Sequence, residues 1–329
     1  MILPLFSRCA FAACATLFLM GASPPPPEPF VYLLPAPKEA IVFAPLLLAD
    51  ANGAYAREGL AVRFERVAGG GMKVGEALGG GKGDAGGALG DTAMILRARG
   101  IPVRGVALLG RHSFLTWMSV QGLAINAASL RGQAIGVPSQ QDVSYYALEA
   151  LLRQVGLTPD DVEVRVAVPD DLIAAMGRGE LKAMIGTVDW GVKAERAGVV
   201  LDYQSLDAYY PALAQAVMAA DGQIANRPKA LQAFTHATLQ SLHAIARDPA
   251  GAARRYVDLV PGSGYDKVEV ERIFWLLSRF VYGVDAGKFD PRTMERAAKA
   301  ASAEGLIPPR GKATDSFTNR FSRISHATR

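Results

Sequence analysis

The amino-acid sequence predicts an α/β fold in which two similarly built, doubly wound domains follow one another. The chain has 329 residues, 50% of them hydrophobic, and at roughly 100–200 residues per domain this is enough for two domains with sizeable cores. Strand-like and helix-like segments alternate from Phe30 to Leu109, and the same alternation begins again near Thr116. Such alternation is typical of a parallel sheet that is covered by helices on both faces.

Local patterns define the elements of the first domain. Ala61–Val67 alternates apolar and charged side chains, as a strand with one face in water does. Pro45 falls near a first helical turn, where proline is tolerated, and Gly100 is the expected C-cap of a helix. The predicted elements are, in order, the strand Phe30–Leu34, the helix Ile41–Ala51, the strand Ala61–Val67, the helix Met72–Leu78, the strand Ala85–Leu89, the helix Ala93–Arg99 and the strand Val103–Leu109.

The second domain repeats this order. Its most regular helix carries Leu148, Leu151, Leu152 and Val155 at i, i+3, i+4 and i+7, which places them on one apolar face, and Gly156 caps it. The predicted elements are the strand Thr116–Val120, the strand Ala134–Val137, the helix around Leu148, the strand Val162–Val166, the helix Asp170–Met176, the strand Lys182–Gly186 and the helix Gly191–Ala197.

The last third of the chain is predicted to be mostly helical. The apolar strand Leu213–Ala219 leads back toward the first domain. Proline at the start of several following segments is typical of first helical turns. The predicted helices, expected to pack on the first domain, are Pro228–Ala246, Pro249–Asp258, Asp266–Tyr282 and Pro291–Glu304.

Residues 1–23 are typical of a secretory signal peptide. A single Arg8 precedes the apolar run Cys9–Met20, which is short for a spanning helix of about 20 apolar residues, and small residues follow. An uncleaved N-terminal anchor is the alternative. Both cysteines, Cys9 and Cys14, lie in this segment, so the mature chain would hold no disulfide, no thiolate nucleophile and no cysteine-ligated metal.

Charge and motif content narrow the function classes. The net charge of +4 is mild and spread along the chain, which argues against nucleic acid as the main partner. The four histidines show no metal-ligand spacing, and the chain contains neither a G-x-S-x-G elbow nor an H-E-x-x-H motif. The sequence therefore predicts no catalytic residue, no metal site and no cofactor.

Glycine occupies half of the positions from Gly69 to Gly90. Glycine is tolerated where the backbone turns sharply or where a ligand approaches the main chain. The turns Gly69–Gly71 and Gly90–Thr92 each open a predicted helix, where backbone N–H groups can bind a small anion or polar ligand. Gly81–Gly86 matches G-x-G-x-x-G, but the strand before it and the acid after it that a dinucleotide site requires are missing, so a loop is the better interpretation.

Two runs in the chain resemble a known family. They are Ala44–Leu60, with the letters APLLLA and GAYAREGL, and Leu130–Pro138, LRGQAIGVP. Together they resemble periplasmic substrate-binding proteins of ABC importers, of the nitrate/sulfonate/taurine and thiamine-pyrimidine-precursor type. The resemblance covers Phe30–Tyr210 well and the C-terminal helices loosely. Asp189-Trp190 stands where the family often has Trp-Glu-Pro, but the Glu-Pro is missing here.

The resemblance implies a type II periplasmic binding protein-like fold of two lobes joined by a hinge, with one ligand held between them. The first lobe would comprise residues 29–114 and 212–329, the second residues 115–211, and the hinge would lie near Phe114–Met118 and Pro211–Met218. The strand ends and the placement of glycine independently indicate most of the same ligand-facing turns. The expected ligand-binding residues are Phe43, Gly70, Gly71, Met72, Gly90, Asp91, Thr92, Phe114, Ser139, Gln140, Gln141, Asp142, Asp189 and Trp190.

Each of these residues also has a plain structural interpretation. Met72 and the aromatic residues could fill a core, and Thr92, Ser139 and Asp142 could cap helices. The expected function is an extracytoplasmic, periplasmic solute-binding protein, monomeric, that takes a small organic anion or a heteroaromatic compound to an ABC permease. The alternatives are a ligand sensor for a membrane signalling partner, a pyrimidine-precursor synthase-like enzyme, and a fold that has lost ligand binding.

Overall fold

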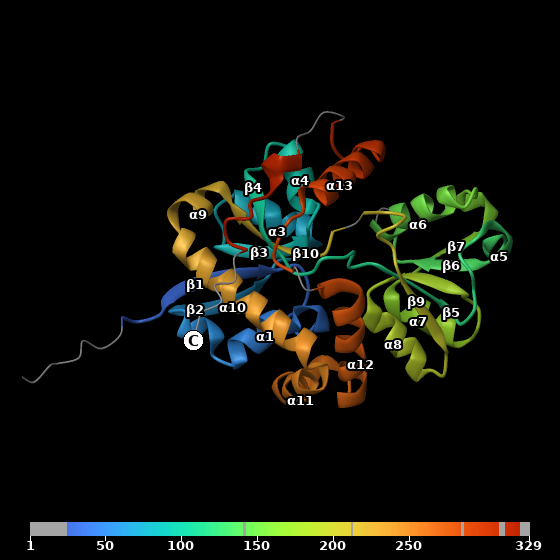
Figure 1. Ribbon diagram of the computed structural model, residues 1–329, viewed down its shortest axis with the longest axis horizontal. Coiled ribbons are helices and arrows are strands. Elements are labelled where there is room, and N and C mark those ends of the chain that lie inside the picture. The colour runs from blue at the N-terminus through green and yellow to red at the C-terminus, as the bar shows by residue number, and fades with distance from the viewer. Residues whose placement is uncertain (1–24, 141–142, 212, 284–285, 309–312, 323–329) are drawn as a thin grey trace, which may run out of the picture.

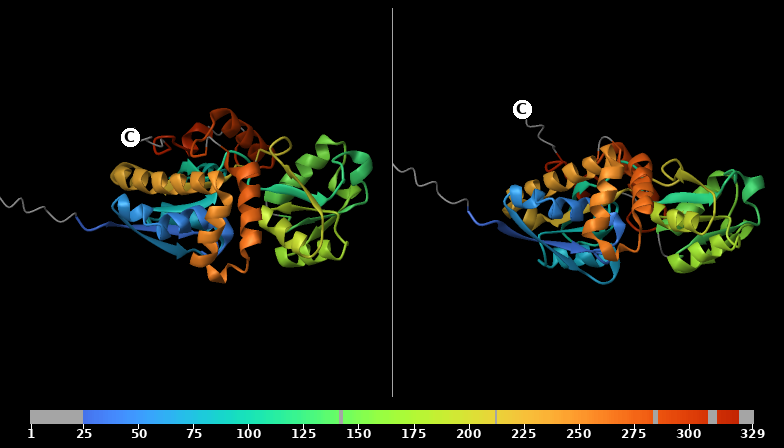
Figure 2. Two further views of the ribbon diagram at one scale, coloured as in Figure 1. Left: turned by 60° about the horizontal axis from the view of Figure 1, so that its bottom comes forward. Right: turned by 90° about the horizontal axis from the view of Figure 1, so that it is seen from below.

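The computed structural model describes residues 25–140, 143–211, 213–283, 286–308 and 313–322. Two lobes lie side by side, each with its own sheet and flanking helices (Figures 1 and 2). The strand order is β2-β1-β3-β10-β4 in the sheet of lobe 1 and β7-β6-β8-β5-β9 in that of lobe 2. The predicted fold class of two doubly wound α/β lobes is therefore confirmed.

Each sheet is mixed, where alternation alone predicted parallel sheets. In lobe 1, β10 runs antiparallel to both β3 and β4, and in lobe 2, β5 runs antiparallel to both β8 and β9. The reason is the path of the chain. Each of these strands follows a connection from the other lobe and enters its sheet at the edge where the parallel strands end, so it must run the opposite way.

The strands have the following bounds. In lobe 1 they are β1 Glu28–Leu34, β2 Leu60–Arg66, β3 Ala85–Leu89, β4 Val103–Leu108 and β10 Gln215–Ala220. In lobe 2 they are β5 Thr116–Val120, β6 Ala134–Val137, β7 Glu163–Val166, β8 Ala183–Gly186 and β9 Leu201–Ser205.

The helices follow the predicted order, with small differences at their starts. The predicted helix Ile41–Ala51 is divided into the 3-10 turn η1 Ile41–Phe43 and α1 Ala44–Ala51. The segment after it, for which no element was predicted, contains α2 Ala54–Arg57. The other helices before β10 are α3 Gly70–Gly79, α4 Thr92–Ala98, α5 Ala127–Leu130, α6 Val143–Gln154, η2 Pro159–Asp161, α7 Pro169–Gly177 and α8 Val188–Arg196.

The C-terminal helices lie mainly on lobe 1, as predicted, but two of them also reach lobe 2 (Figure 1). Arg272 of α12 pairs with Glu195 of lobe 2, and Glu304 after α13 lies 3.8 Å from Arg153 of lobe 2. The helices and helical turns after β10 are α9 Asp221–Asn226, α10 Pro228–Arg247, α11 Pro249–Leu259, η3 Pro261–Ser263, α12 Lys267–Leu277, the π-helical turn η4 Ser278–Tyr282, α13 Pro291–Ala303 and η5 Ala313–Ser316.

A stack of aromatic rings forms the centre of the lobe 1 core. The ring of Phe234 on α10 lies nearly parallel to those of Phe30, Tyr32 and Tyr55, with centroids 4.7, 4.9 and 5.0 Å away. All four residues are 1% exposed or less. This stack fixes α10 on the sheet and thereby anchors the C-terminal third of the chain.

Two connections join the lobes, and one side chain links them. Residues 109–115 lead from β4 to β5, and residues 206–214 lead from β9 to β10. Asp207 of the second connection accepts the N–H of Ser113 and lies 2.7 Å from Nδ1 of His112, both on the first. The domain boundaries expected from the sequence, after residues 114 and 211, stay a prediction. None of the described helices is long and apolar enough to cross a membrane.

Candidate ligand-binding site

The carboxyl edges of both sheets meet at the connections. β4 ends at Leu108, just before the first connection, and β5 starts at Thr116, where it pairs with Gly186 at the end of β8. β10 begins at Gln215 beside Leu89, the end of β3. In open α/β sheets, ligands bind outside the carboxyl ends of the strands. The candidate site is therefore the zone between these two edges, which we call the cleft.

Asp189 lies in the cleft, where lobe 2 contacts lobe 1. It is in the first turn of α8, and its carboxylate accepts hydrogen bonds from the hydroxyl of Thr187 and, at 3.1 Å, from the hydroxyl of Tyr265 in lobe 1. Burial raises the pKa of Asp189, and the two hydrogen bonds only partly offset this. The predicted residue thus forms a polar bridge between the lobes.

Trp190 belongs to lobe 2 and is partly buried. Its ring lies directly on the backbone of Gly186, since a Cβ placed there would come within 2.1 Å of a ring atom. The ring packs with the lobe 2 cluster that includes Ala167 and Tyr203. It therefore covers the carboxyl end of β8. Phe114, also predicted, is partly buried against the lobe 1 core instead.

A second meeting point of the lobes surrounds Tyr210. The pKa of Tyr210 is raised above its ordinary range, mainly because the hydroxyl is buried. The electrostatic effect of the nearby Asp91 raises it further, and Glu304 and Tyr146 add to this. Asp91 comes from the start of α4 in lobe 1 and Tyr146 from the first turns of α6 in lobe 2. The structure thus brings the predicted Gly90–Thr92 turn toward the start of α6.

The backbone at this turn is already engaged. The N–H of Gly90 donates to the carbonyl of Ala214 at 2.9 Å, and a Cβ on Gly90 would lie 2.7 Å from that of Leu213. Close approach of the second connection is thus what requires glycine there. Asp91 and Thr92 are 6% and 7% exposed.

The other predicted residues of lobe 1 serve packing. Phe43 is 1% exposed within the core, and Met72 packs between two apolar clusters of the lobe. A Cβ on Gly71 would lie 2.6 Å from that of Ala88, so α3 rests closely on β3. Gly70, with φ +77°, has open space around it. Ligand contact by these residues stays a prediction.

At the lobe 2 edge, Ser139 is partly buried and Gln140 is exposed directly after β6. Gln141 and Asp142 lie outside the described residues, as does the predicted signal segment. Their expected roles stay predictions.

The residues that sequence reasoning missed are mostly tyrosines of the C-terminal helices. Tyr265 contacts Asp189, and Tyr256 on α11 donates its hydroxyl to the carbonyl of Glu39, in the loop after β1. Burial, followed by Asp189, raises the pKa of Tyr265. The available signal for Tyr265 is its position directly before Asp266, the N-cap of α12.

Tyr32 and Gln215 add polar atoms beneath the lobe 1 edge. Tyr32 is fully buried, and its hydroxyl has no hydrogen-bond partner among the described residues. A Cβ on Gly87 would lie 3.0 Å from this hydroxyl and 3.2 Å from Nε2 of Gln215. An unpaired buried hydroxyl costs about 1–3 kcal/mol, which a partner reaching it would recover.

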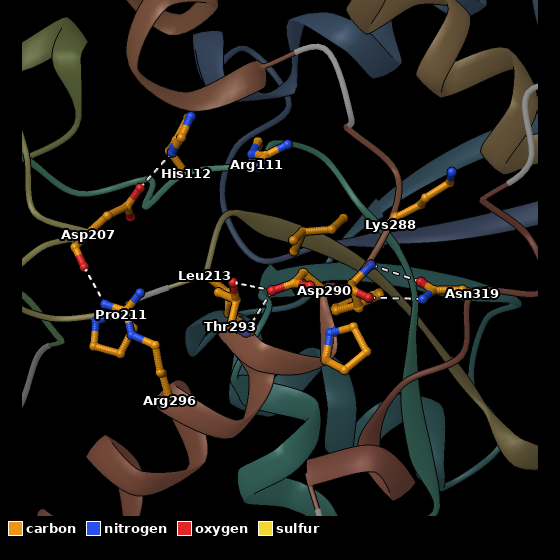
Figure 3. Close-up of a pocket in the computed structure, with 13 residues that line it drawn as sticks. Arg111, His112, Asp207, Pro211, Leu213, Lys288, Asp290, Thr293, Arg296 and Asn319 are labelled. Carbon is orange, nitrogen blue, oxygen red and sulfur yellow. Dashed lines mark hydrogen bonds and ion pairs between the residues drawn. The ribbon is translucent and has the colours of Figure 1, made fainter.

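A separate pocket of about 650 Å³ lies at the connections and the start of α13 (Figure 3). It contains none of the residues predicted from the sequence. Its lining residues are Leu108, Arg111, His112, Asp207, Pro211, Leu213, Lys288, Phe289, Asp290, Pro291, Thr293, Arg296 and Asn319. We call it the hinge pocket.

Known proteins share this sequence pattern and this fold. The chain is 26% identical over 294 residues to riboflavin-binding protein RibY of Chloroflexus aurantiacus, covering 85% of this chain and 82% of that one. It is 27% identical over 262 residues to 4-amino-5-hydroxymethyl-2-methylpyrimidine phosphate synthase of Aspergillus parasiticus, covering 72% and 73%.

In fold, the chain is similar to the periplasmic aliphatic sulphonate binding protein SsuA of Escherichia coli. The TM-score is 0.67 at 15% identity, over 88% of this chain and 92% of that chain. Residues 40–252, well over half of the chain, match the sequence profile of the NMT1/THI5-like family. This protein is therefore a member of the NMT1/THI5-like family.

Proposed function

We propose that this protein is an extracytoplasmic solute-binding protein that captures a small heteroaromatic molecule between its lobes and delivers it to an ABC importer. The observation that carries the proposal is the cleft itself. Two strand-end edges meet there, and Asp189 of one lobe bonds to Tyr265 of the other. A bridge of this kind forms only when the lobes are together, so it couples ligand capture to closure.

The chemistry of the cleft favours a flat, polar-edged ligand over a simple anion. Trp190 and Phe114 offer aromatic surface, on which flat rings stack. Asp189 offers carboxylate oxygens that can accept from ring N–H and amino groups. A relative named as riboflavin-binding, aligned over 85% of this chain, supports the same class.

A ligand panel tests the proposal. The mature chain would be titrated by calorimetry and thermal shift with riboflavin, 4-amino-5-hydroxymethyl-2-methylpyrimidine, an aliphatic sulfonate and nitrate. We expect micromolar or tighter binding of one of the two heteroaromatics, with the compound recovered unchanged. Binding of the sulfonate or nitrate alone would overturn the ligand class.

Two matched tryptophan variants place the bound ligand. Trp190→Ala should weaken heteroaromatic binding at least tenfold, because it removes the ring over the end of β8. Trp275→Ala removes an equal ring that is 46% exposed on α12 and lies under Arg272, so it should cost no more than the up to fivefold loss expected of Arg272→Gln. Equal losses in both variants would mean that the ligand does not occupy the cleft.

An enzyme is the second candidate, supported by the relative named as a pyrimidine phosphate synthase. The same panel separates the two, because chromatography of the incubated ligands would reveal turnover. Delivery to a permease is tested in cells by deleting the gene and measuring uptake of the bound compound. Uptake should fall in the deletion strain and return with the wild-type gene but not with Trp190→Ala.

A further inference from the structure

The hinge pocket is built by four separate parts of the chain, the last of which contributes only Asn319. Arg111 and His112 come from the first connection, Asp207 from the second, and Arg296 from α13 (Figure 3). Its volume of about 650 Å³ lies within the range of small-molecule sites. Because both connections line it, its shape depends on how the lobes are placed.

The acidic side chains of this pocket are already occupied. One carboxylate oxygen of Asp207 accepts the N–H of Ser113, and the other lies 2.7 Å from the ring of His112. Asp290 caps α13, accepting both the N–H and the hydroxyl of Thr293 at 2.8 Å. These hydrogen bonds occupy the carboxylate oxygens and fix their positions, while the two negative charges remain in the lining.

Two of the basic side chains that line the pocket have no acidic partner in the described part of the chain. Lys288 and Arg296 are exposed, and neither has a carboxylate partner within 4 Å in the described part of the chain. Arg296 donates only to the backbone carbonyl of Asp207, at 2.8 Å. Arg111 also lines the pocket. Apolar side chains such as Leu213 and Pro291 complete the walls.

We propose that the hinge pocket is a second binding site, for a small molecule with phosphate or carboxylate groups, whose occupation biases the opening and closing of the lobes. Guanidinium and ammonium groups around a concave surface are the donors that such anions require. Because lobe rotation moves the connections, the anion binds the two lobe arrangements with different affinity. That difference links the hinge pocket to the cleft.

A charge-matched pair of double variants tests the site. Calorimetry of the mature chain with inorganic pyrophosphate, and with citrate as a second probe, should detect binding at millimolar or lower concentration. Lys288→Gln with Arg296→Gln should weaken it at least tenfold. Arg292→Gln with Lys299→Gln removes the same charge from exposed positions of α13 outside the lining, and should leave it unchanged. No binding of either probe, or equal loss in both double variants, would overturn the site.

Further measurements separate this proposal from that for the cleft. Trp190→Ala should keep wild-type affinity for pyrophosphate, and a loss there would place the anion in the cleft and overturn the second site. Saturating pyrophosphate should change the Kd of the cleft ligand identified by the panel at least twofold, and the ligand should change the Kd of pyrophosphate by the same factor. Unchanged values would overturn the coupling. If no cleft ligand is found, small-angle scattering with and without pyrophosphate reports the lobe movement instead.

Discussion

The two lobes wind their sheets in the same order, but they are completed differently. In lobe 1, the C-terminal helix α10 covers the sheet and adds Phe234 to a stack of buried rings. In lobe 2, α8 is covered by α12 and the residues before it, which belong to the other lobe, through Glu195–Arg272 and Asp189–Tyr265. Lobe 1 is thus covered mainly by its own helices, with Val188 and Val192 of α8 added to its core, while lobe 2 completes its surface through contacts that break when the lobes separate. We therefore expect stability to depend most on lobe 1 and ligand affinity on lobe 2.

The largest expected effect is the loss of the lobe 1 ring stack. Phe234→Ala removes a ring that faces three others and leaves a cavity, so the free energy of unfolding should fall by about 3–5 kcal/mol. Urea unfolding followed by circular dichroism measures this. Gln240→Ala, at an exposed position of the same helix, should stay within about 0.5 kcal/mol of wild type. A loss below 1 kcal/mol for Phe234→Ala would show that the stack does not anchor lobe 1.

The next effect concerns the edge of lobe 2. Gly186→Ala places a methyl group 2.1 Å from the ring of Trp190, so the ring must move away from the end of β8. Such overpacking costs about 1–3 kcal/mol, and ligand affinity should fall with it, as in Trp190→Ala. Unfolding and titration would both be measured.

Gly222→Ala in lobe 1 is the matched control, because its added Cβ meets nothing within 4 Å and its backbone is helical. It should stabilise by about 0.5–1 kcal/mol and leave binding unchanged. Unchanged affinity in Gly186→Ala would mean that the placement of Trp190 is irrelevant to the site.

A pH series distinguishes the bridge between the lobes from the lobe cores. Burial raises the pKa of Asp189 in the folded state, so the folded protein binds a proton more tightly than the unfolded chain. The resulting stability is fully present below the ordinary aspartate pKa of about 3.9 and is lost as pH rises through the raised value. Asp189→Asn cannot titrate.

The free energy of unfolding of wild type, relative to Asp189→Asn, should therefore fall as pH rises from about 4 toward 7. Asp290→Asn is the contrasting control, because hydrogen bonds from Thr293 lower the pKa of Asp290: its stabilisation is lost only as pH falls below about 3.9, and the difference should stay flat from pH 4 to 7. A flat difference for Asp189→Asn would contradict the burial of this carboxylate.

Sequence reasoning recovered the order of most elements because their signals are local, but the strand β9 and the short helix α9 were not predicted. The C-terminal helices were located well since Asp248, Asp266 and Asp290 precede them as N-caps and proline opens two of them. The mixed direction of the sheets was missed, because the chain alone does not show from which edge a returning strand enters.

The candidate site was less predictable because it depends on distant pairings. Asp189 and Trp190 were predicted as ligand-facing residues from the family resemblance and from their position after a strand, and that role stays a prediction. Their partner Tyr265 is 76 residues further along the chain, and no local pattern connects the two. Phe43 and Met72 also stand at element starts, but only packing reveals that they face a core. The position of a residue in the sequence indicates at which edge of the sheet it lies. The direction of its side chain, toward the cleft or toward the core, depends on tertiary packing.

The smallest expected effect is the loss of the ion pair between the lobes. Arg272 donates to both carboxylate oxygens of Glu195 across the cleft, at 3.2 and 2.8 Å. Partly exposed pairs contribute roughly 0.2–1 kcal/mol, so Arg272→Gln should weaken ligand binding by up to about fivefold. Arg178→Gln removes an equally bidentate pair, with Glu180, that lies entirely within lobe 2. It should leave ligand affinity at the wild-type value.

The effect of Arg272→Gln should also shrink in 0.5 M salt, where the screening length is shorter than at physiological ionic strength. Calorimetric titrations of both variants at two salt concentrations decide the matter. Equal affinity in the two variants would mean that α12 and α8 touch without contributing to closure, and that lobe 2 holds its ligand by the cleft residues alone.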